Sequence, residues 1–200
     1  MKKFVALLLA VLMVASLCAC GQKDTGSDLQ TVTKGKLIMS TNAEFAPYEY
    51  VADDGKGYEG TGFEGIDIEI AYALAQKLGL ELVVDDMDFD AALLAVQQNK
   101  SDIVMAGVTV TDERQKVMDF SDTYAEGIQS IIVPEDSDIA SADDLTGKAI
   151  GTQRGTTGYI YCTDDFGEDN VIAYDDGLTA VQALNNGQVD AVVIDNAPAQ

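Results

Sequence analysis

Hydrophobic and polar positions repeat with two different periods along the chain, and these periods predict strands and helices in turn. Helices are predicted at 65–79 and 90–98, and shorter ones at 141–147, 156–163 and 178–187. Strands alternating with helices of this length indicate an α/β chain with a mostly parallel sheet. Short apolar runs bounded by polar or glycine residues predict the strands, which lie at 36–41, 80–87, 102–110, 127–134, 148–152, 171–175 and 189–195.

The segment GIDIEIAYALAQKLG (65–79) has the clearest helical pattern. Asp67 and Glu69 fall in its first turn, where the helix dipole favours negative charge. Gly79 follows the last apolar position as a stop signal. Apolar side chains that recur every four residues predict its buried face: Ile66, Ile70, Leu74 and Leu78, with Ala71 and Ala75 beside them.

The N-terminus has a different pattern. Lys2 and Lys3 precede an uncharged, largely apolar run over 4–19, which is short for a membrane span. Residues 1–19 therefore have the layout of a secretory leader, with a core helix or a short membrane anchor as the alternative.

The residues around Cys20 add a second signal. Leu17-Cys18-Ala19-Cys20-Gly21 resembles the bacterial lipobox, and this resemblance implies that Cys20 is lipidated and becomes the new N-terminus. Several acyl chains together would hold the protein stably at the membrane, whereas one chain binds only marginally. Residues 20–35 are polar and without periodicity, so we expect a flexible tether between the membrane and the folded part.

Charge and composition exclude several functions. The chain carries 34 Asp and Glu against 12 Lys and Arg, a net charge of −22, so its surface repels nucleic acid and anionic lipid. It contains no histidine, which excludes Ser-His-Asp and Cys-His nucleophilic sites and the usual imidazole zinc site. The carboxylates leave a two-carboxylate hydrolase open. With Cys18 removed in the leader and Cys20 lipidated, Cys162 would be left without a cysteine partner, so we expect no intrachain disulfide and a partly buried thiol.

Polar residues follow several of the predicted strands. In parallel sheets, ligands sit beyond the carboxyl ends of the strands, and Asn42, Gly107, Gln153 and Asp195 fall at such ends. The stretch MAGVTVTDER (105–114) also places hydroxyls, a glycine and an arginine at one predicted strand end. These positions predict one binding site at the edge of the sheet.

Several motifs in a fixed order carry a resemblance to a known family. They are GIDIEIAYALAQKL, DMDFDAALLAVQQNKSDIVMAGVTVTDERQKVMDFSDTY, LTGKAIGTQRGTTGYIY and VDAVVIDNAPA. Together they resemble the bacterial extracellular solute-binding proteins of the polar amino-acid type, which are the capture subunits of ABC importers. The resemblance covers nearly everything from residue 36 to the end.

This resemblance implies a periplasmic-binding-protein-like α/β fold of two lobes that close over a ligand as a hinged trap. Lobe 1 would span 36–126 and lobe 2 would span 127–200, with a crossing near 124–129. Family members continue beyond the position of Gln200 and return to complete lobe 1, so both lobes are expected to be incomplete. We therefore expect exposed apolar surface, and a sharp two-state melt of residues 20–200 would contradict this expectation.

The resemblance also assigns the two charged ends of a free amino acid. Arg114 matches the arginine that binds the ligand carboxylate, for which a guanidinium supplies a two-donor fork. Asp195 matches the aspartate that binds the ammonium group. Phe45 and Phe89 match an aromatic pair that encloses the aliphatic part of the ligand. The remaining matched positions are Asn42, Ala106, Gly107, Thr109, Gln153, Thr156 and Thr157.

Each assignment has a structural alternative. Arg114 could pair with Asp112 or Glu113 at the surface, Asp195 could cap a helix, and the two phenylalanines could belong to the core. Asn42 and Gln153 depart from the better-defined relatives, so the side-chain preference stays open between glutamine-like and basic amino acids.

The function implied is binding of a polar amino acid outside the cytoplasm and its delivery to ABC permease subunits. We expect a monomer with no cofactor and no metal, attached to the membrane by its N-terminal lipid. An enzyme on the same fold, such as a dehydratase of prephenate-like acids, and a ligand-sensing domain are the alternatives.

Overall fold

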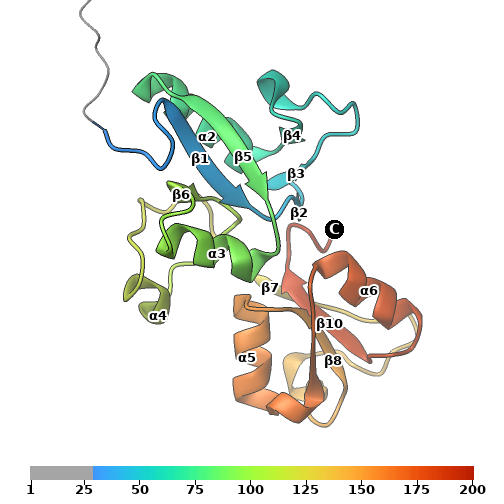
Figure 1. Cartoon of the computed structure of the whole chain (residues 1–200). Helices are drawn as coiled ribbons and strands as arrows, with labels where there is room; N and C mark the ends of the chain where they lie inside the picture. Colours follow the sequence, from blue (N-terminus) through green and yellow to red (C-terminus); the bar gives the residue numbers. More distant parts are fainter. Residues whose placement is uncertain (1–28) are drawn as a thin grey trace, which may run out of the picture.

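The structure is a computed structural model, and it describes residues 29–200. The predicted leader, Cys20 and most of the predicted tether therefore lie outside the described residues. Two bodies, each built around its own sheet, make up the described part (Figure 1). No helix within it is long and apolar enough to cross a membrane.

The first body contains a parallel sheet in the order β5-β1-β6 with a helix on each face. Met39 packs with Ile68 of one helix, and the hydroxyl of the next residue, Ser40, donates to the Ala92 carbonyl of the other at 3.0 Å. Successive side chains of a strand point to opposite faces, so β1 is covered on both sides. The elements are β1 (Lys36–Thr41), β5 (Glu81–Asp86), β6 (Ile103–Val104), α2 (Ile66–Leu78) and α3 (Phe89–Gln97).

A small antiparallel sheet joins β1 to α2. Its strands run in the order β2-β3-β4, and β3 pairs with β4 across a connection that contains Asp54 and Gly55. This sheet places Phe45 and Glu49 opposite one another at the end of the first body. The elements are β2 (Glu44–Phe45), β3 (Glu49–Val51), η1 (Tyr58–Gly60) and β4 (Phe63–Glu64).

The second body contains a four-stranded sheet in the order β7-β10-β8-β9, in which only β7 is antiparallel. Val193 packs in a cluster with Cys162 of one helix, and Val192 packs with Ala180 of the other. The two helices therefore cover opposite faces, and Cys162 is buried. The elements are β7 (Gln129–Ile132), β8 (Ile150–Gln153), α5 (Thr157–Phe166), η3 (Glu168–Asn170), β9 (Val171–Tyr174), α6 (Gly177–Asn185) and β10 (Ala191–Asp195).

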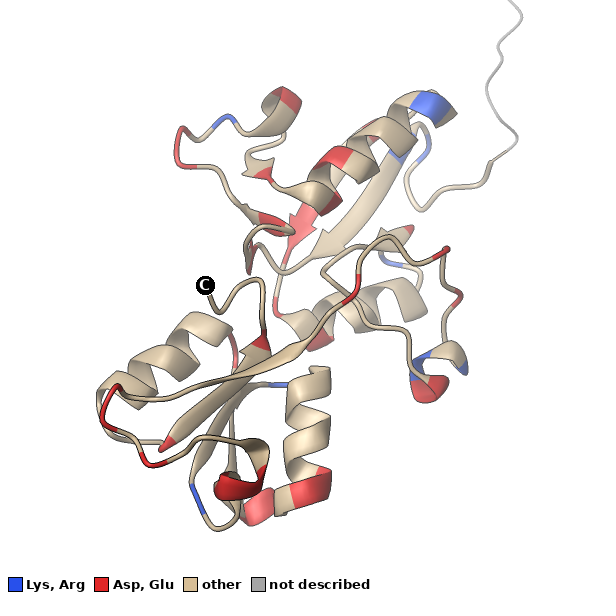
Figure 2. Cartoon of the chain, turned by 180° about the vertical axis from the view of Figure 1, so that it is seen from behind, with Lys and Arg blue, Asp and Glu red and all other residues tan. Residues whose placement is uncertain are grey.

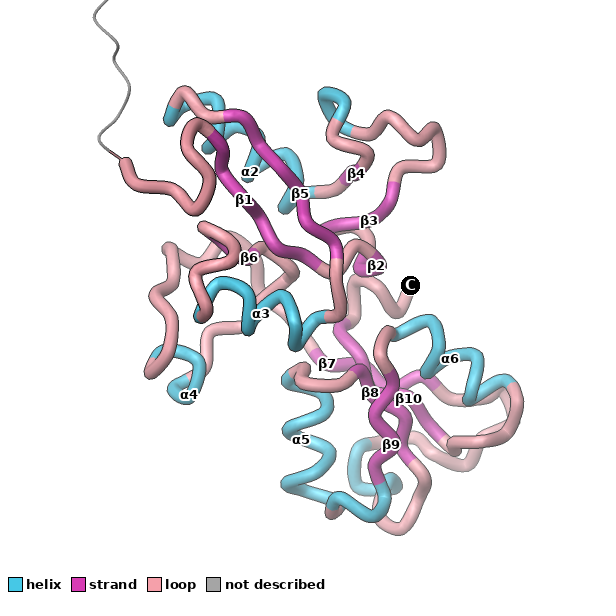
Figure 3. The backbone as a smooth tube through the Cα atoms, viewed as in Figure 1, coloured by secondary structure: helices cyan, strands magenta, loops and turns pink. Residues whose placement is uncertain are grey.

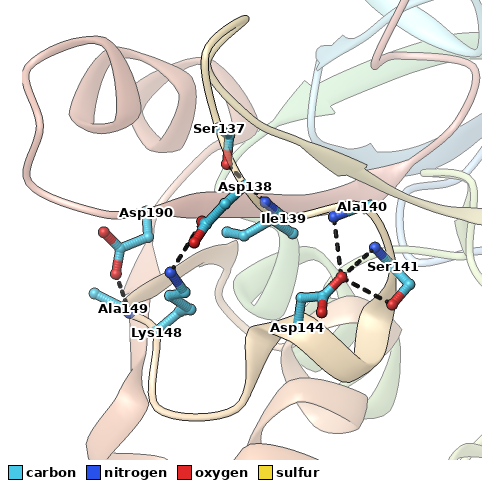
Figure 4. Close-up of polar contacts among 9 residues, drawn as sticks. All are labelled: Ser137, Asp138, Ile139, Ala140, Ser141, Asp144, Lys148, Ala149 and Asp190. Atoms are coloured by element: carbon cyan, nitrogen blue, oxygen red, sulfur yellow. Dashed lines mark hydrogen bonds and ion pairs between the residues drawn. The ribbon is translucent and has the colours of Figure 1, made fainter.

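Polar contacts fix the connection between β7 and β8 (Figure 4). It contains η2 (Ala142–Leu145), and the Asp144 carboxylate accepts from the N–H groups of Ala140 at 3.0 Å and Ser141 at 2.9 Å. These bonds hold the pKa of Asp144 below its usual range. The sequence predicts a short helix at 141–147, and the structure contains a shorter 3₁₀ helix with a capping box at Ser141.

The strand predicted at 102–110 is wrong beyond Val104, where the observed strand β6 (Ile103–Val104) ends. β6 pairs with β1 only at Ile103 and Val104, and a loop follows up to α4 (Asp112–Gln115). Gly107 has a φ of 55°, which a strand does not allow, so the alternation of valine and threonine does not belong to a sheet. Figure 3 shows the long stretch between β6 and β7, which is loop apart from α4.

The predicted buried face of α2 is also wrong in part. Ala71 and Ala75 are buried, as the pattern predicts. Ile68 and Asp67 are buried as well, although neither belongs to the predicted face. Three members of the four-residue stripe are exposed by 37–43%: Ile66, Ile70 and Leu74. Two of the four buried residues are alanines, which permit the helix to lie close against β1 and β5.

Asp and Glu residues are spread along the ribbon of both bodies, and Lys and Arg residues are few (Figure 2). The ion pairs of the described residues are exposed or half-exposed contacts, such as Lys148 with Asp138 at 3.2 Å, and contribute little stability. The fold therefore depends on the apolar clusters around the two sheets rather than on ion pairs.

Candidate functional site

A cavity lies between the two bodies at the carboxyl ends of their central strands. All eleven ligand-binding residues predicted from the sequence line it, together with one residue that was not predicted, Glu49. The space open to water-sized molecules is about 20 Å³, room for roughly one water molecule. Admission of a larger ligand therefore requires the two bodies to move apart. The lining is Asn42, Phe45, Glu49, Phe89, Ala106, Gly107, Thr109, Arg114, Gln153, Thr156, Thr157 and Asp195.

Arg114 is buried on the first body's side of the cavity. It lies in α4, whose N-cap Thr111 accepts a hydrogen bond from the Arg114 N–H at 3.2 Å. Its guanidinium donates to the Thr109 carbonyl at 2.8 Å and to the Gly155 carbonyl of the second body at 3.0 Å. The guanidinium carbon also lies 5.4 Å from the centre of the Phe89 ring. Burial lowers the pKa of Arg114 from its ordinary value, but an arginine remains charged at neutral pH.

Glycine is required where the backbone of the first body approaches Phe45. Gly107 has a φ of 55°, and a Cβ at this position would lie 3.0 Å from Cε1 of Phe45. Its N–H donates to Oδ2 of Asp67 at 3.0 Å, which fixes the loop to the start of α2. The Gly107 loop is therefore held on two sides, by an aromatic ring and by a carboxyl group.

The second body contributes the N-terminus of α5. Thr156 is its N-cap, and its hydroxyl accepts from the Tyr159 N–H at 3.3 Å and donates to the Gln153 carbonyl at 2.8 Å. The Thr157 hydroxyl accepts from Gln129 at 3.3 Å. The positive end of this 10-residue helix therefore lies at the cavity, where both Thr156 and Thr157 belong to the lining, and Thr156 also serves as the cap.

Asp195 ends β10 and lies half-buried in the lining of the cavity, to which it belongs together with Arg114 of α4. It pairs across the strands with Gln129, whose side-chain N–H donates to its carboxylate. Burial raises the pKa of Asp195, and the hydrogen bond from Gln129 lowers it in part. None of the ion pairs found among residues 29–200 involves Asp195, so this carboxylate is available to a cation in the cavity.

Two residues predicted near the ligand side chain contact each other. Gln153 donates to Oδ1 of Asn42 at 2.7 Å and to the Asp175 carbonyl at 3.2 Å, and Asn42 donates to the Met87 carbonyl at 3.1 Å. Both side chains are buried. Together with the Arg114 bond to Gly155, this pair joins the two bodies across the cavity.

Glu49 is the lining residue that the sequence did not reveal. It is fully buried, with 0% of its surface exposed, and as a carboxylate it finds no hydrogen-bond donor. As a carboxylic acid it can donate to the neighbouring Asp67, and burial together with Asp67 raises its pKa to about 11. Asp67 in turn accepts from the Tyr124 hydroxyl at 2.8 Å, and burial next to Asp67 raises the pKa of Tyr124.

Sequence reasoning also missed Asp67, Tyr124 and Gln129, which position the cavity residues rather than line the cavity. Asp67 was interpreted only as a favourable charge in the first turn of a helix. No local pattern distinguishes these residues, because their contacts join segments 28 to 66 positions apart. Among residues 29–200, no group of three or more metal-ligating side chains is present.

Comparison with known proteins identifies relatives of this site and fold. The sequence profile of the bacterial extracellular solute-binding proteins, family 3, matches residues 37–191. The arginine-binding extracellular protein ArtP of Bacillus subtilis is 42% identical over 156 residues, which are 78% of this chain and 57% of ArtP. A probable histidine-binding protein of Neisseria gonorrhoeae is 34% identical over 98% of this chain and 72% of its own length.

A solved structure resembles the whole two-body arrangement. The arginine-bound form of a truncated arginine-binding protein, ArgBP of T. maritima, superposes with a TM-score of 0.76 at 36% identity. The alignment covers 84% of this chain and 77% of that structure. The two sheets therefore have the fold of a two-lobed amino-acid-binding protein, as the sequence predicts.

Proposed function

This chain belongs to the bacterial extracellular solute-binding proteins of family 3, and from that membership we propose that it binds a free polar amino acid outside the cytoplasm and delivers it to the permease of an ABC importer. The matched family consists of binding proteins rather than enzymes, and the named relatives are amino-acid-binding proteins. We therefore assign the chain to ligand capture without chemistry.

One observation carries this proposal. A guanidinium from the first body and a carboxylate from the second, Arg114 and Asp195, line the same cavity. A free amino acid has the opposite pair of charges, a carboxylate and an ammonium group, a fixed distance apart. The guanidinium supplies paired donors to the carboxylate, and Asp195 accepts from the ammonium group. The N-terminus of α5 adds donors on the side of the carboxylate.

Binding would also bring the two bodies together. A ligand held by residues of both bodies stabilises the closed arrangement, because only that arrangement provides all of its contacts. The permease would then recognise the closed form. Two of the relatives bind arginine by name, which favours a basic over a glutamine-like side chain.

Titration calorimetry of the chain with each of the twenty amino acids tests the proposal. We expect saturable binding of one or a few polar amino acids, with no product formed on long incubation. Absence of binding by every amino acid to folded protein would overturn it. Conversion of the ligand to another compound would favour an enzyme instead.

We also propose that Cys20 carries the lipid that attaches the protein to the membrane. The apolar leader and the lipobox-like residues support this assignment. Expression of the wild type and of Cys20→Ser in a bacterial host, followed by fractionation, tests it. We expect wild-type protein in the membrane fraction and the variant in the soluble fraction, and equal partitioning would contradict the anchor.

A further inference from the structure

Asp67 is a buried carboxyl group that lies outside the cavity lining. It is the second residue of α2 and is 0% exposed, and it belongs to none of the ion pairs found among residues 29–200. A buried carboxylate without a cation depends on hydrogen-bond donors for its stability. The donors of Asp67 therefore show which parts of the chain it joins.

Two segments far apart in the sequence supply those donors. The Gly107 N–H donates to one carboxyl oxygen at 3.0 Å, and the Tyr124 hydroxyl donates to the other at 2.8 Å. The acid form of Glu49 lies beside Asp67 and can supply a third. Gly107 lines the cavity, whereas Tyr124 belongs to the connecting segment (116–128), which runs from α4 to β7 and joins the two bodies (Figure 3). Asp67 therefore ties the Gly107 loop to the connecting segment.

The Gly107 loop passes this restraint on to Arg114. Gly107 has a φ of 55° and its N–H is fixed by Asp67, so the backbone that follows leaves it in a fixed direction. Two residues later, the Thr109 carbonyl accepts from the Arg114 guanidinium at 2.8 Å. A series of hydrogen bonds and a short stretch of backbone therefore lead from the Tyr124 hydroxyl to the group proposed to bind the ligand carboxylate.

The connecting segment also passes beside the other charged group of the cavity. A Cβ on Gly127 would lie 3.4 Å from Oδ1 of Asp195, so the backbone of the segment runs against this carboxylate. Within the described part of the chain, the bond from Tyr124 to Asp67 is the one hydrogen bond found between residues 119–127 and the first body. The segment therefore runs between the two charged groups of the cavity, and Tyr124 fixes its position on the first body.

We propose that Asp67 is a positioning residue through which the connecting segment sets the geometry of the Gly107 loop. With both hydrogen bonds in place, the loop holds the Arg114 guanidinium ready before the ligand arrives. Without the bond from Tyr124, the loop adopts other conformations in the free protein, and the apparent affinity falls with the fraction of molecules that are ready to bind. This inference rests on the proposed function, and it adds a route by which the connecting segment acts on the site.

Tyr124→Phe tests this route with the smallest change. The side chain of Tyr124 is 47% exposed, so the variant loses the hydroxyl and little packing. The probe is the one of the twenty amino acids that binds the wild type most tightly in titration calorimetry. We expect Tyr124→Phe to bind it roughly three- to tenfold more weakly, and Asp67→Asn, whose amide has a single acceptor oxygen, roughly 10- to 100-fold more weakly. In Asp67→Asn, the further change Tyr124→Phe should cost less than about twofold, because the route is already broken.

Asp102→Asn and Tyr161→Phe are the matched controls. Asp102 also accepts two hydrogen bonds from distant backbone, from the Val32 N–H at 2.7 Å and the Ile38 N–H at 2.8 Å, and it does not line the cavity. Its variant should lose stability in urea unfolding, as Asp67→Asn does, but should keep the wild-type affinity. Tyr161 is 60% exposed on α5, and Tyr161→Phe should keep both stability and affinity.

The Gly107 amide proton gives a readout that a loss of stability alone would not change. An amide proton donated to a carboxylate resonates downfield, because such a bond is charge-assisted and strong. In spectra of ligand-free, ¹⁵N-glycine-labelled protein, the Gly107 signal is identified by its absence in Gly107→Ala. We expect Asp67→Asn to shift this signal, and Tyr124→Phe to shift it as well, although Tyr124 is bonded to the other oxygen of Asp67. Both controls should leave it in place.

The outcomes separate this proposal from the proposed function. Wild-type affinity in folded Tyr124→Phe, or an unmoved Gly107 signal in that variant, overturns the positioning role and leaves amino-acid binding intact. Equal losses of affinity in Asp102→Asn and Asp67→Asn overturn it as well, since destabilisation would then explain both. If Asp67→Asn does not fold, Tyr124→Phe alone decides the question. If the folded wild type binds none of the twenty amino acids, both proposals fail.

Discussion

Arg114 and Gly155 are joined across the cavity, where the guanidinium of one donates to the carbonyl of the other at 3.0 Å. The two residues belong to different bodies, so this contact exists only when the bodies are close together. The same guanidinium also donates to the Thr109 carbonyl and retains further donors, since arginine carries five N–H groups. Arg114 therefore joins the proposed carboxylate site to the closed arrangement of the protein.

Replacement of Arg114 by lysine should weaken binding of every amino-acid ligand. Lysine keeps the charge but loses the planar fork, so it cannot contact a carboxylate and the Gly155 carbonyl with the same geometry. We expect a loss of affinity of about 100-fold, measured by calorimetry. Arg154→Lys is the control, because Arg154 is exposed and pairs with Asp175. Equal losses in both variants would contradict a specific role for Arg114.

Protonation of Asp195 should weaken ligand binding at acid pH. Its ionised form is the one that accepts from an ammonium group, and burial raises its pKa. Affinity should therefore fall as the pH decreases, starting at a higher pH than an ordinary aspartate would require. Calorimetry between pH 7 and pH 4 checks this, and Asp195→Asn should bind weakly at every pH.

Gln129→Met tests whether Gln129 controls the pH at which Asp195 loses its ability to bind the ligand. The methionine has a similar length but removes the hydrogen bond that lowers the pKa of Asp195. The midpoint of the loss of affinity should then move to higher pH than in the wild type. A midpoint that stays in place would show that Gln129 does not tune Asp195.

Gly107→Ala should lower ligand affinity more than it lowers stability. Alanine at a φ of 55° costs roughly 1 kcal/mol, and its Cβ would also press on Phe45 in the cavity wall. Gly187→Ala is a close control, because Gly187 has a φ of 68° and no atom within 4 Å of an added Cβ. Both variants should lose similar stability in urea unfolding, and only Gly107→Ala should lose affinity.

The sequence predicted those features that depend on local pattern. The strand at 36–41 has the bounds of β1, and the helix at 65–79 matches α2 to within one residue at each end. Arg114 and Asp195, which line the cavity, were predicted as ligand-binding residues through motifs that contain them. By contrast, the strand at 102–110 was wrong because its length depends on pairing with β1, which ends at Val104. Periodicity within the segment carries no information about where a partner strand stops.

Glu49 shows why part of the site could not be predicted. It lies between Tyr48 and Tyr50 at the start of β3, and glutamates in proteins are ordinarily exposed. Its burial results from the packing of the small sheet against the start of α2, where Asp67 lies beside it. Such a position is visible only when segments distant in sequence are brought together.

Glu49 should also make the stability of the unliganded protein depend on pH. In the unfolded chain, a glutamate ionises near its ordinary value of 4.5, whereas in the folded protein burial and Asp67 raise the pKa of Glu49 to about 11. Between these values the folded state binds the additional proton, so the free energy of unfolding should decrease as the pH rises. The slope for one such group is at most about 1.4 kcal/mol per pH unit.

Urea unfolding at pH 6, 7 and 8 isolates this effect, because the chain has no histidine to titrate in that range. The wild type and Glu44→Gln, a control in which the replaced glutamate is exposed, should lose stability steadily from pH 6 to pH 8. Glu49→Gln should have a much flatter profile and be more stable than the wild type at pH 8, since its amide needs no proton to remain neutral. A slope in Glu49→Gln equal to that of the wild type would assign the pH dependence to another group and contradict a protonated Glu49 in the folded protein.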